Sequence, residues 1–205
     1  MKNNFDRYIL LLIIALLLFF LGDYVLKTFK SENAIAQNTE VKETITNYGY
    51  SLSSNDTNIY SDYFSELKNL LNENNFNEEE YAELVAKLFV IDFYTLDNKM
   101  NNSDVGGLEF VYSDIVSNFK QKAEDTIYKY IESNIYGKRE QELPIVTDVS
   151  VESIKNVIYN YDGLTDKNAY EVEVSISYYE DLGYDTSLTL YFVHEDNKLS
   201  LVEMG

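Results

Sequence analysis

The sequence predicts an α+β protein in which an N-terminal transmembrane helix and a polar spacer precede three helices packed on a curved, four-stranded antiparallel meander. Three observations lead to this fold class. An unbroken apolar run, Ile9–Leu21, stands near the N-terminus. Apolar residues then recur at three-and-four spacing as far as Ile135, which is typical of amphipathic helices. From Ile145 onward polar and apolar residues alternate, which is typical of β-strands.

The apolar run predicts a single-pass membrane anchor within residues 1–30. A basic N-terminus precedes the run, which is the order of an export signal or a signal-anchor. With its flanks the apolar stretch reaches from Tyr8 to Leu26, close to the roughly 20 residues that a spanning helix needs. We expect a cytoplasmic N-terminus and an extracytoplasmic C-terminal domain. Two alternatives stay open, namely a tethered cytoplasmic domain and secretion after cleavage following Ala36.

Composition narrows the choice of partners. The chain has 35 acidic and 16 basic residues, a net charge of −19, which argues against nucleic acid because phosphate contacts need Lys and Arg. It has no Cys and one His, so disulfides and the usual zinc sites are not expected. The predicted partners are therefore the membrane, through residues 9–21, and another protein or a second copy of the chain, with no metal and no cofactor.

Residues 31–58 are polar and are interpreted as a spacer, with a short strand or helical extension near Val41–Thr46 as the alternative. The extracytoplasmic domain is expected over 59–205. Its three helices are predicted at the following ranges: Ile59–Asn72, a second beginning after the cap residue Asn77 and ending near Asp97, and Leu108–Ile135.

Four strands are predicted at Val149–Tyr161, Ala169–Glu180, Tyr184–His194 and Lys198–Met204. The turns between the last three are short, and short turns connect antiparallel neighbours, so the strands should form a meander. A bulge is expected at Ser153, where the alternation is disturbed.

Helices first and a meander second, behind a membrane anchor, resemble the nuclear transport factor 2-like superfamily. More narrowly, the order is similar to that of the bitopic subunits of type IV secretion and Gram-positive conjugation channels. The resemblance covers Ile59–Gly205 and rests on element order. It implies a cone-like fold and a role in assembly, although the same cone also houses isomerases, dehydratases and cyclases.

Asp92 is the candidate catalytic residue because it stands on an apolar face of the second predicted helix. A carboxyl group there is costly unless it is hydrogen-bonded, and burial would raise its pKa. It would serve as a general acid or base in a pocket, or as a structural group bonded to a Tyr hydroxyl or a backbone amide. His194 is expected to be a solvated side chain beside a turn, with a dyad with Asp92 as the alternative.

Tyrosines are frequent in the predicted sheet and offer a candidate binding surface, since Tyr is enriched at interfaces that remain partly accessible to water. Ordinary strand preference for aromatic residues is the alternative explanation. The candidates are Tyr159, Tyr161, Tyr170, Tyr178 and Tyr191. We therefore expect a non-enzymatic envelope protein that binds protein partners, with a small-molecule or lyase-like pocket around Asp92 as the alternative.

Overall fold

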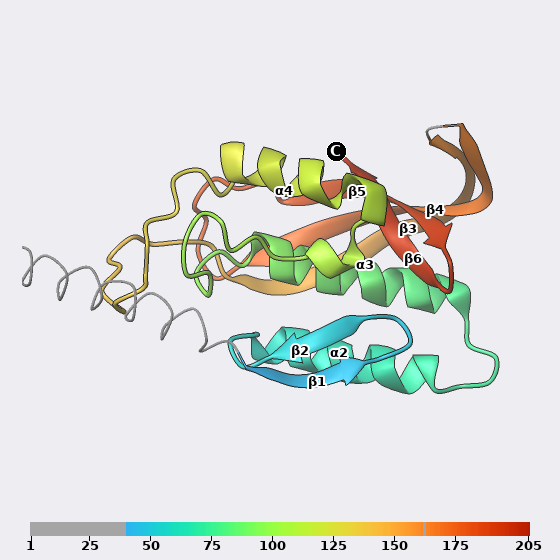
Figure 1. Cartoon of the computed structure of the whole chain (residues 1–205), viewed down its shortest axis with the longest axis horizontal. Helices are drawn as coiled ribbons and strands as arrows, with labels where there is room; N and C mark the ends of the chain where they lie inside the picture. The colour runs from blue at the N-terminus through green and yellow to red at the C-terminus, as the bar shows by residue number, and fades with distance from the viewer. Residues whose placement is uncertain (1–39, 162) are drawn as a thin grey trace, which may run out of the picture. The chain divides into compact units, whose positions relative to one another are not determined.

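The computed structural model of the chain describes residues 40–161 and 163–205, and Val41–Gly205 form one compact unit (Figure 1). The predicted anchor at 9–21 and the cleavage site after Ala36 lie outside the described residues. Among the described residues, no helix is both long enough and apolar enough to span a membrane. The compact unit is an α+β fold with three helices and a four-stranded antiparallel sheet.

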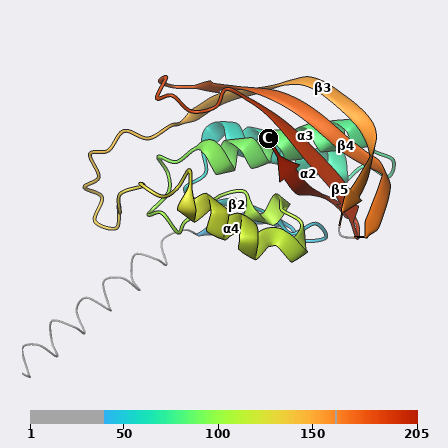
Figure 2. The same ribbon diagram turned by 90° about the horizontal axis from the view of Figure 1, so that it is seen from above.

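The sheet is the predicted meander. Its strands β3 (Val146–Tyr161), β4 (Leu164–Tyr178), β5 (Ser187–Glu195) and β6 (Lys198–Met204) pair in chain order. The register of β3 against β4 shifts at three places, one of them between Val151 and Ser153, where the sequence predicts a bulge. Bulges bend a strand and increase its twist. Figure 2 shows the strands curving over α3.

Helix α3 (Glu78–Tyr94) lies on the concave side of this sheet (Figure 2). The Asn77 side chain accepts a hydrogen bond from Glu79 N at 3.0 Å and so caps the helix. Three Glu residues follow in the first turn, where the helix dipole favours negative charge. Most of the later turns are buried all round, because the sheet and helix α2 (Asn58–Leu71) pack against them.

The third helix is much shorter than the predicted Leu108–Ile135. Two 3-10 turns, η1 (Leu108–Phe110) and η2 (Ser113–Ile115), precede helix α4, which spans only Val116–Asp125. Between the turns the chain is extended, because Val111 forms a parallel bridge with Leu201 of β6 and Tyr112 N donates to Leu201 O at 2.9 Å. Backbone groups of Val111 and Tyr112 thus pair with the edge strand β6, and they are not available for the hydrogen bonds of a continuous helix.

A β-hairpin occupies part of the stretch interpreted as a spacer. Strands β1 (Val41–Ile45) and β2 (Tyr50–Ser53) pair antiparallel. Tyr50 is fully buried, and its hydroxyl lies 2.7 Å from that of Tyr81 in α3. Tyr81 in turn accepts a hydrogen bond from Leu199 N of β6 at 3.1 Å. The hairpin therefore belongs to the core, and the folded unit begins at Val41 and not at the predicted residue 59.

This role of the hairpin predicts a large stability difference between two of its residues. Tyr50→Ala should lower the free energy of unfolding by about 3–5 kcal/mol, because it leaves a cavity and removes a buried hydroxyl partner. Val41→Ala, at a site that is 57% exposed, should change it by less than about 0.5 kcal/mol. Urea unfolding of both variants measures the difference. Equal, small losses would mean that the hairpin is a dispensable spacer after all.

Candidate functional site

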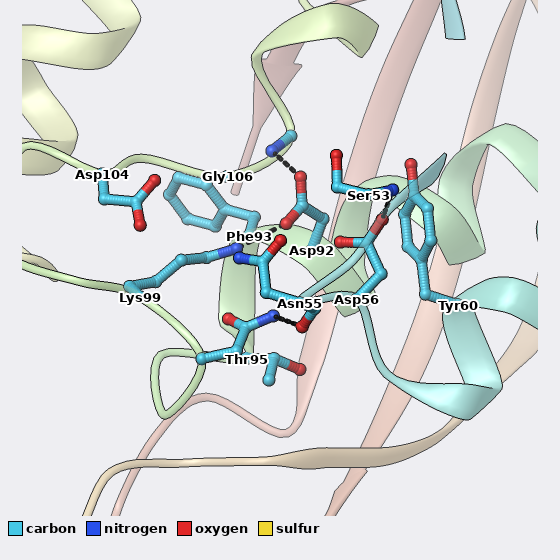
Figure 3. A network of polar contacts seen from close by, with 12 residues as sticks. Ser53, Asn55, Asp56, Tyr60, Asp92, Phe93, Thr95, Lys99, Asp104 and Gly106 are labelled. Atoms are coloured by element: carbon cyan, nitrogen blue, oxygen red, sulfur yellow. Dashed lines mark hydrogen bonds and ion pairs between the residues drawn. The ribbon is translucent and has the colours of Figure 1, made fainter. Parts of the chain in front are cut away.

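Asp92, the candidate catalytic residue, lies in a network of polar contacts near the end of α3 (Figure 3). One carboxylate oxygen lies 2.5 Å from Lys99 Nζ, and the other accepts a hydrogen bond from Gly107 N at 2.6 Å. The Lys99 side chain is only 4% exposed, whereas that of Asp92 is 19% exposed. Both carboxylate oxygens therefore have protein partners, one of them a backbone amide.

The local sequence explains why this network forms. A Cβ atom at Gly106 would lie 2.3 Å from the backbone oxygen of Asp92, and Gly107 has a φ angle of 74°. Only glycine tolerates both the close approach and the left-handed conformation without strain. The glycine pair thus lets the segment after Lys99 lie directly on α3. Arg139 contacts the start of this segment by donating to Lys99 O at 2.7 Å.

Two further carboxyl groups lie on the side of the network that faces the hairpin and α2. Burial raises the pKa of Asp56 and of Glu109 above their ordinary values. Glu109 accepts hydrogen bonds from Ser51 N and Oγ, at 3.0 and 2.8 Å, and from the Tyr60 hydroxyl at 3.1 Å. These contacts join β2, α2 and η1. Among the described residues, no group of three or more His, Cys, Asp or Glu side chains is arranged to hold a metal ion.

A cavity of about 660 Å³ lies elsewhere, between α4, the end of α3, β6 and the loop at 183–185. Phe93 and Tyr94 line it, but Asp92, one residue earlier, does not. Half-buried apolar side chains of α4 and its flanks line the cavity: Ile115, Phe119 and Ile127. The sequence predicts these three residues on the apolar face of a longer helix. Lys122 and Glu203 are among the charged residues that line the cavity. The sequence does not predict this cavity. The cavity lies beside α4, which is shorter than the helix that the apolar residues of Leu108–Ile135 predict.

The five candidate tyrosines do not form one surface. Tyr170 is buried on the helical side, where its hydroxyl donates to Glu78 at 3.0 Å, and Tyr178 is half buried with its hydroxyl on Asp185 O. Tyr159 and Tyr191 lie together, with ring centroids 5.5 Å apart. Tyr191 is on the outer face, because its neighbours Leu190 and Phe192 point into the core. The fifth, Tyr161, packs against Tyr112 instead.

His194 is exposed near the end of its strand, as predicted, but both of its ring nitrogens have a carboxylate partner. Its Nδ1 lies 2.8 Å from Asp166 of β4, and its Nε2 lies 2.9 Å from Glu78 in the first turn of α3. The curl of the sheet brings these two carboxylates together at the end of β5. Partial burial opposes protonation, but the hydrogen bonds to Asp166 and Glu78 outweigh it and raise the pKa of His194. The alternative dyad with Asp92 does not form.

The Asp92–Lys99 pair should behave as a coupled unit. Lys99→Met and Asp92→Asn each leave one charge without its partner, so each should cost about 3 kcal/mol of stability. The double variant should cost clearly less than the sum of the two, as measured by urea unfolding.

An exposed ion pair provides the matched control. Lys155 contacts Glu171 and Glu173 at 2.9 and 2.8 Å, and its side chain is 53% exposed. Lys155→Met should therefore cost no more than about 1 kcal/mol. Additive costs at Asp92 and Lys99 would show that the two groups do not stabilise each other.

The contact of His194 with two carboxylates should make stability depend on pH in a defined direction. The folded-state pKa is raised, so the contribution is complete below the ordinary value of 6.5 and is lost as pH rises through the raised pKa. The stability advantage of the wild type over His194→Gln should therefore be larger at about pH 6 than at about pH 9. Denaturant titrations at both pH values measure it. An advantage independent of pH would exclude the charged interaction.

Comparison of the chain with protein-family models, with curated proteins and with solved structures finds no match. The resemblance to the nuclear transport factor 2-like superfamily therefore stays a prediction that rests on element order.

Proposed function

We propose that the chain is a single-pass membrane-anchored envelope protein whose extracytoplasmic domain binds a protein partner or a second copy of itself. The observation that carries the proposal is the apolar run Ile9–Leu21, followed by a folded acidic unit that begins at Val41. Such a run partitions into the bilayer and holds the folded unit at the membrane surface. The acidic charge of the chain favours partners with basic surfaces.

The outer face of the sheet supports a role in protein binding. Tyr159 and Tyr191 pack together there, and the Tyr159 hydroxyl donates to Glu203 at 2.5 Å. Glu171 and Glu173 lie along β4, with Lys155 between them. Aromatic residues are enriched at protein interfaces, and the rim around them is polar and accessible to solvent. We extend the proposal to assembly of a secretion- or conjugation-type complex, for which the predicted resemblance and its cone-like fold are the support.

Two measurements in cells test the proposal. A reporter active only outside the cytoplasm, fused after Gly205, should be active in the full chain and inactive when residues 9–21 are replaced by a polar segment. An inactive reporter on the full chain would overturn the extracytoplasmic placement. Crosslinking followed by mass spectrometry should then recover a defined partner or a dimer, and recovery of monomer alone would overturn the binding role.

The cavity beside α4 favours a second candidate function, binding of a small apolar molecule. Its volume of about 660 Å³ lies within the range of ligand pockets, and Ala123 on its wall is 4% exposed. Asp92 is outside this wall, so the cavity supports ligand binding and gives no support to chemistry by that residue. A ligand extracted with the wild-type protein and lost from Ala123→Phe, which fills the cavity, would favour this function. Equal recovery from both proteins would exclude it.

A further inference from the structure

A second, smaller hollow of about 330 Å³ lies where three segments meet: the far end of the β3–β4 hairpin, the end of β5 and the extended residues between η1 and η2. Tyr112, Tyr159 and Tyr161 line it, with Asp166 and His194 beside them. We call these five residues the tyrosine hollow. Three tyrosines in one small hollow come from two segments far apart in sequence, so the curl of the sheet creates the site.

The rings of the hollow form a corner. Tyr112 and Tyr161 stand nearly perpendicular, with an interplanar angle of 71° and centroids 5.3 Å apart. Tyr159 adds a third ring, which packs against Tyr191 with centroids 5.5 Å apart. Aromatic faces carry negative electrostatic potential, and several rings around one small space are the arrangement that attracts a cation. Aromatic rings alone would bind a neutral apolar group equally well, so the charges around the hollow determine whether it favours a cation.

The charges around the hollow are mainly negative. The electrostatic neighbours of Tyr112 include Asp114, Glu195 and Asp196. Glu203, which is not among the lining residues, accepts the hydrogen bond from the Tyr159 hydroxyl. On the positive side, Lys198 is an electrostatic neighbour of Glu195.

His194 adds a positive charge when it is protonated, but its ring nitrogens are already held by Asp166 and Glu78. The carboxylates therefore outnumber the cations, and the local field adds to the attraction of the rings for a positive group.

We propose that the tyrosine hollow binds the cationic end of an arginine or lysine side chain presented by a partner protein. The inference deepens the proposed function, on which it rests for the existence of a partner, by naming the chemistry that the partner must offer. A long side chain suits the site because its hydrocarbon stem can lie along Val193, which also lines the hollow, while the charged end reaches the rings.

The test uses the full-length chain in a maltoside detergent, whose head group is uncharged, with carbon-13 label in the tyrosine rings. A short glycine-flanked arginine peptide, its lysine counterpart and its citrulline counterpart are titrated separately, and choline forms a fourth arm. The arginine or lysine peptide should shift the ring signals of Tyr112, Tyr159 and Tyr161. Citrulline, which has the shape of arginine without its charge, should shift them at least about fivefold less at the same concentration.

Three results would overturn the inference. Equal shifts with citrulline would mean that charge is not recognised, and an absence of shifts with both cationic peptides would mean that the hollow binds neither side chain. Shifts with choline but not with either cationic peptide would assign the hollow to a free quaternary ammonium and not to a protein side chain.

Variants at one ring separate its electrostatic role from its volume. Tyr161→Phe keeps the aromatic face and should leave the affinity for the arginine peptide within about twofold. Tyr161→Leu keeps an apolar side chain without the aromatic face and should lower the affinity by roughly fivefold. Tyr136→Leu, at a tyrosine that is 68% exposed and outside the hollow, is the matched control and should have no effect. Equal affinity in the Phe and Leu variants would contradict the role of the ring face.

Crosslinking in cells distinguishes failure of this inference from failure of the proposed function. If wild type and Tyr161→Leu recover the same partner in equal amounts, the domain binds proteins but not through the hollow. If the peptides bind as expected and no partner or dimer is recovered, the hollow recognises a cation and the proposed function fails.

Discussion

Burial of α3 on nearly every side is the constraint on which the rest of the described structure depends. A helix that is apolar all round needs a neighbour on each side, because exposed apolar surface costs free energy in water. The curled sheet covers one side and α2 covers another. The hairpin and β6 meet the N-terminal half through the hydrogen-bonded pair Tyr50 and Tyr81 and the amide of Leu199. The segment after Lys99 covers the C-terminal half, where Asp92 and the two glycines fasten it.

Two partly buried carboxyl groups, those of Asp92 and Glu109, connect elements of the fold. Asp92 joins α3 to the loop that follows it. Glu109 joins η1 to the hairpin and to α2. These directional hydrogen bonds fix the relative positions of elements that apolar packing, which is non-directional, specifies less closely. The hydrogen bonds of these two carboxyl groups are thus made within the fold. The three places on which the proposals rest lie elsewhere: the cavity beside α4, the outer face of the sheet and the tyrosine hollow at the end of the β3–β4 hairpin.

The curl of the sheet connects the fold to these sites. It brings Asp166 and His194 to the first turn of α3, and it brings the end of β3 to the extended residues after η1. A flat sheet would leave Tyr161 and Tyr112 far apart. The same curvature leaves room beside α4 for a cavity, because the short helix cannot fill the space below β6. The curvature of the sheet, and not a sequence motif, thus creates the hollows on which the proposals rest.

Local patterns in the sequence determined the α+β class of the described residues, the first two helices and the four paired strands, because periodicity and capping are properties of neighbouring residues. They also marked Asp92 as unusual, since a carboxyl on an apolar face is visible without a structure. Only the tertiary structure decided the rest. Val111 joined the sheet edge where the pattern favoured a helix, Tyr50 brought a polar stretch into the core, and His194 acquired two carboxylate partners. Each of these outcomes depends on contacts between residues distant in sequence, whose free energies exceed local preferences and leave no periodic trace.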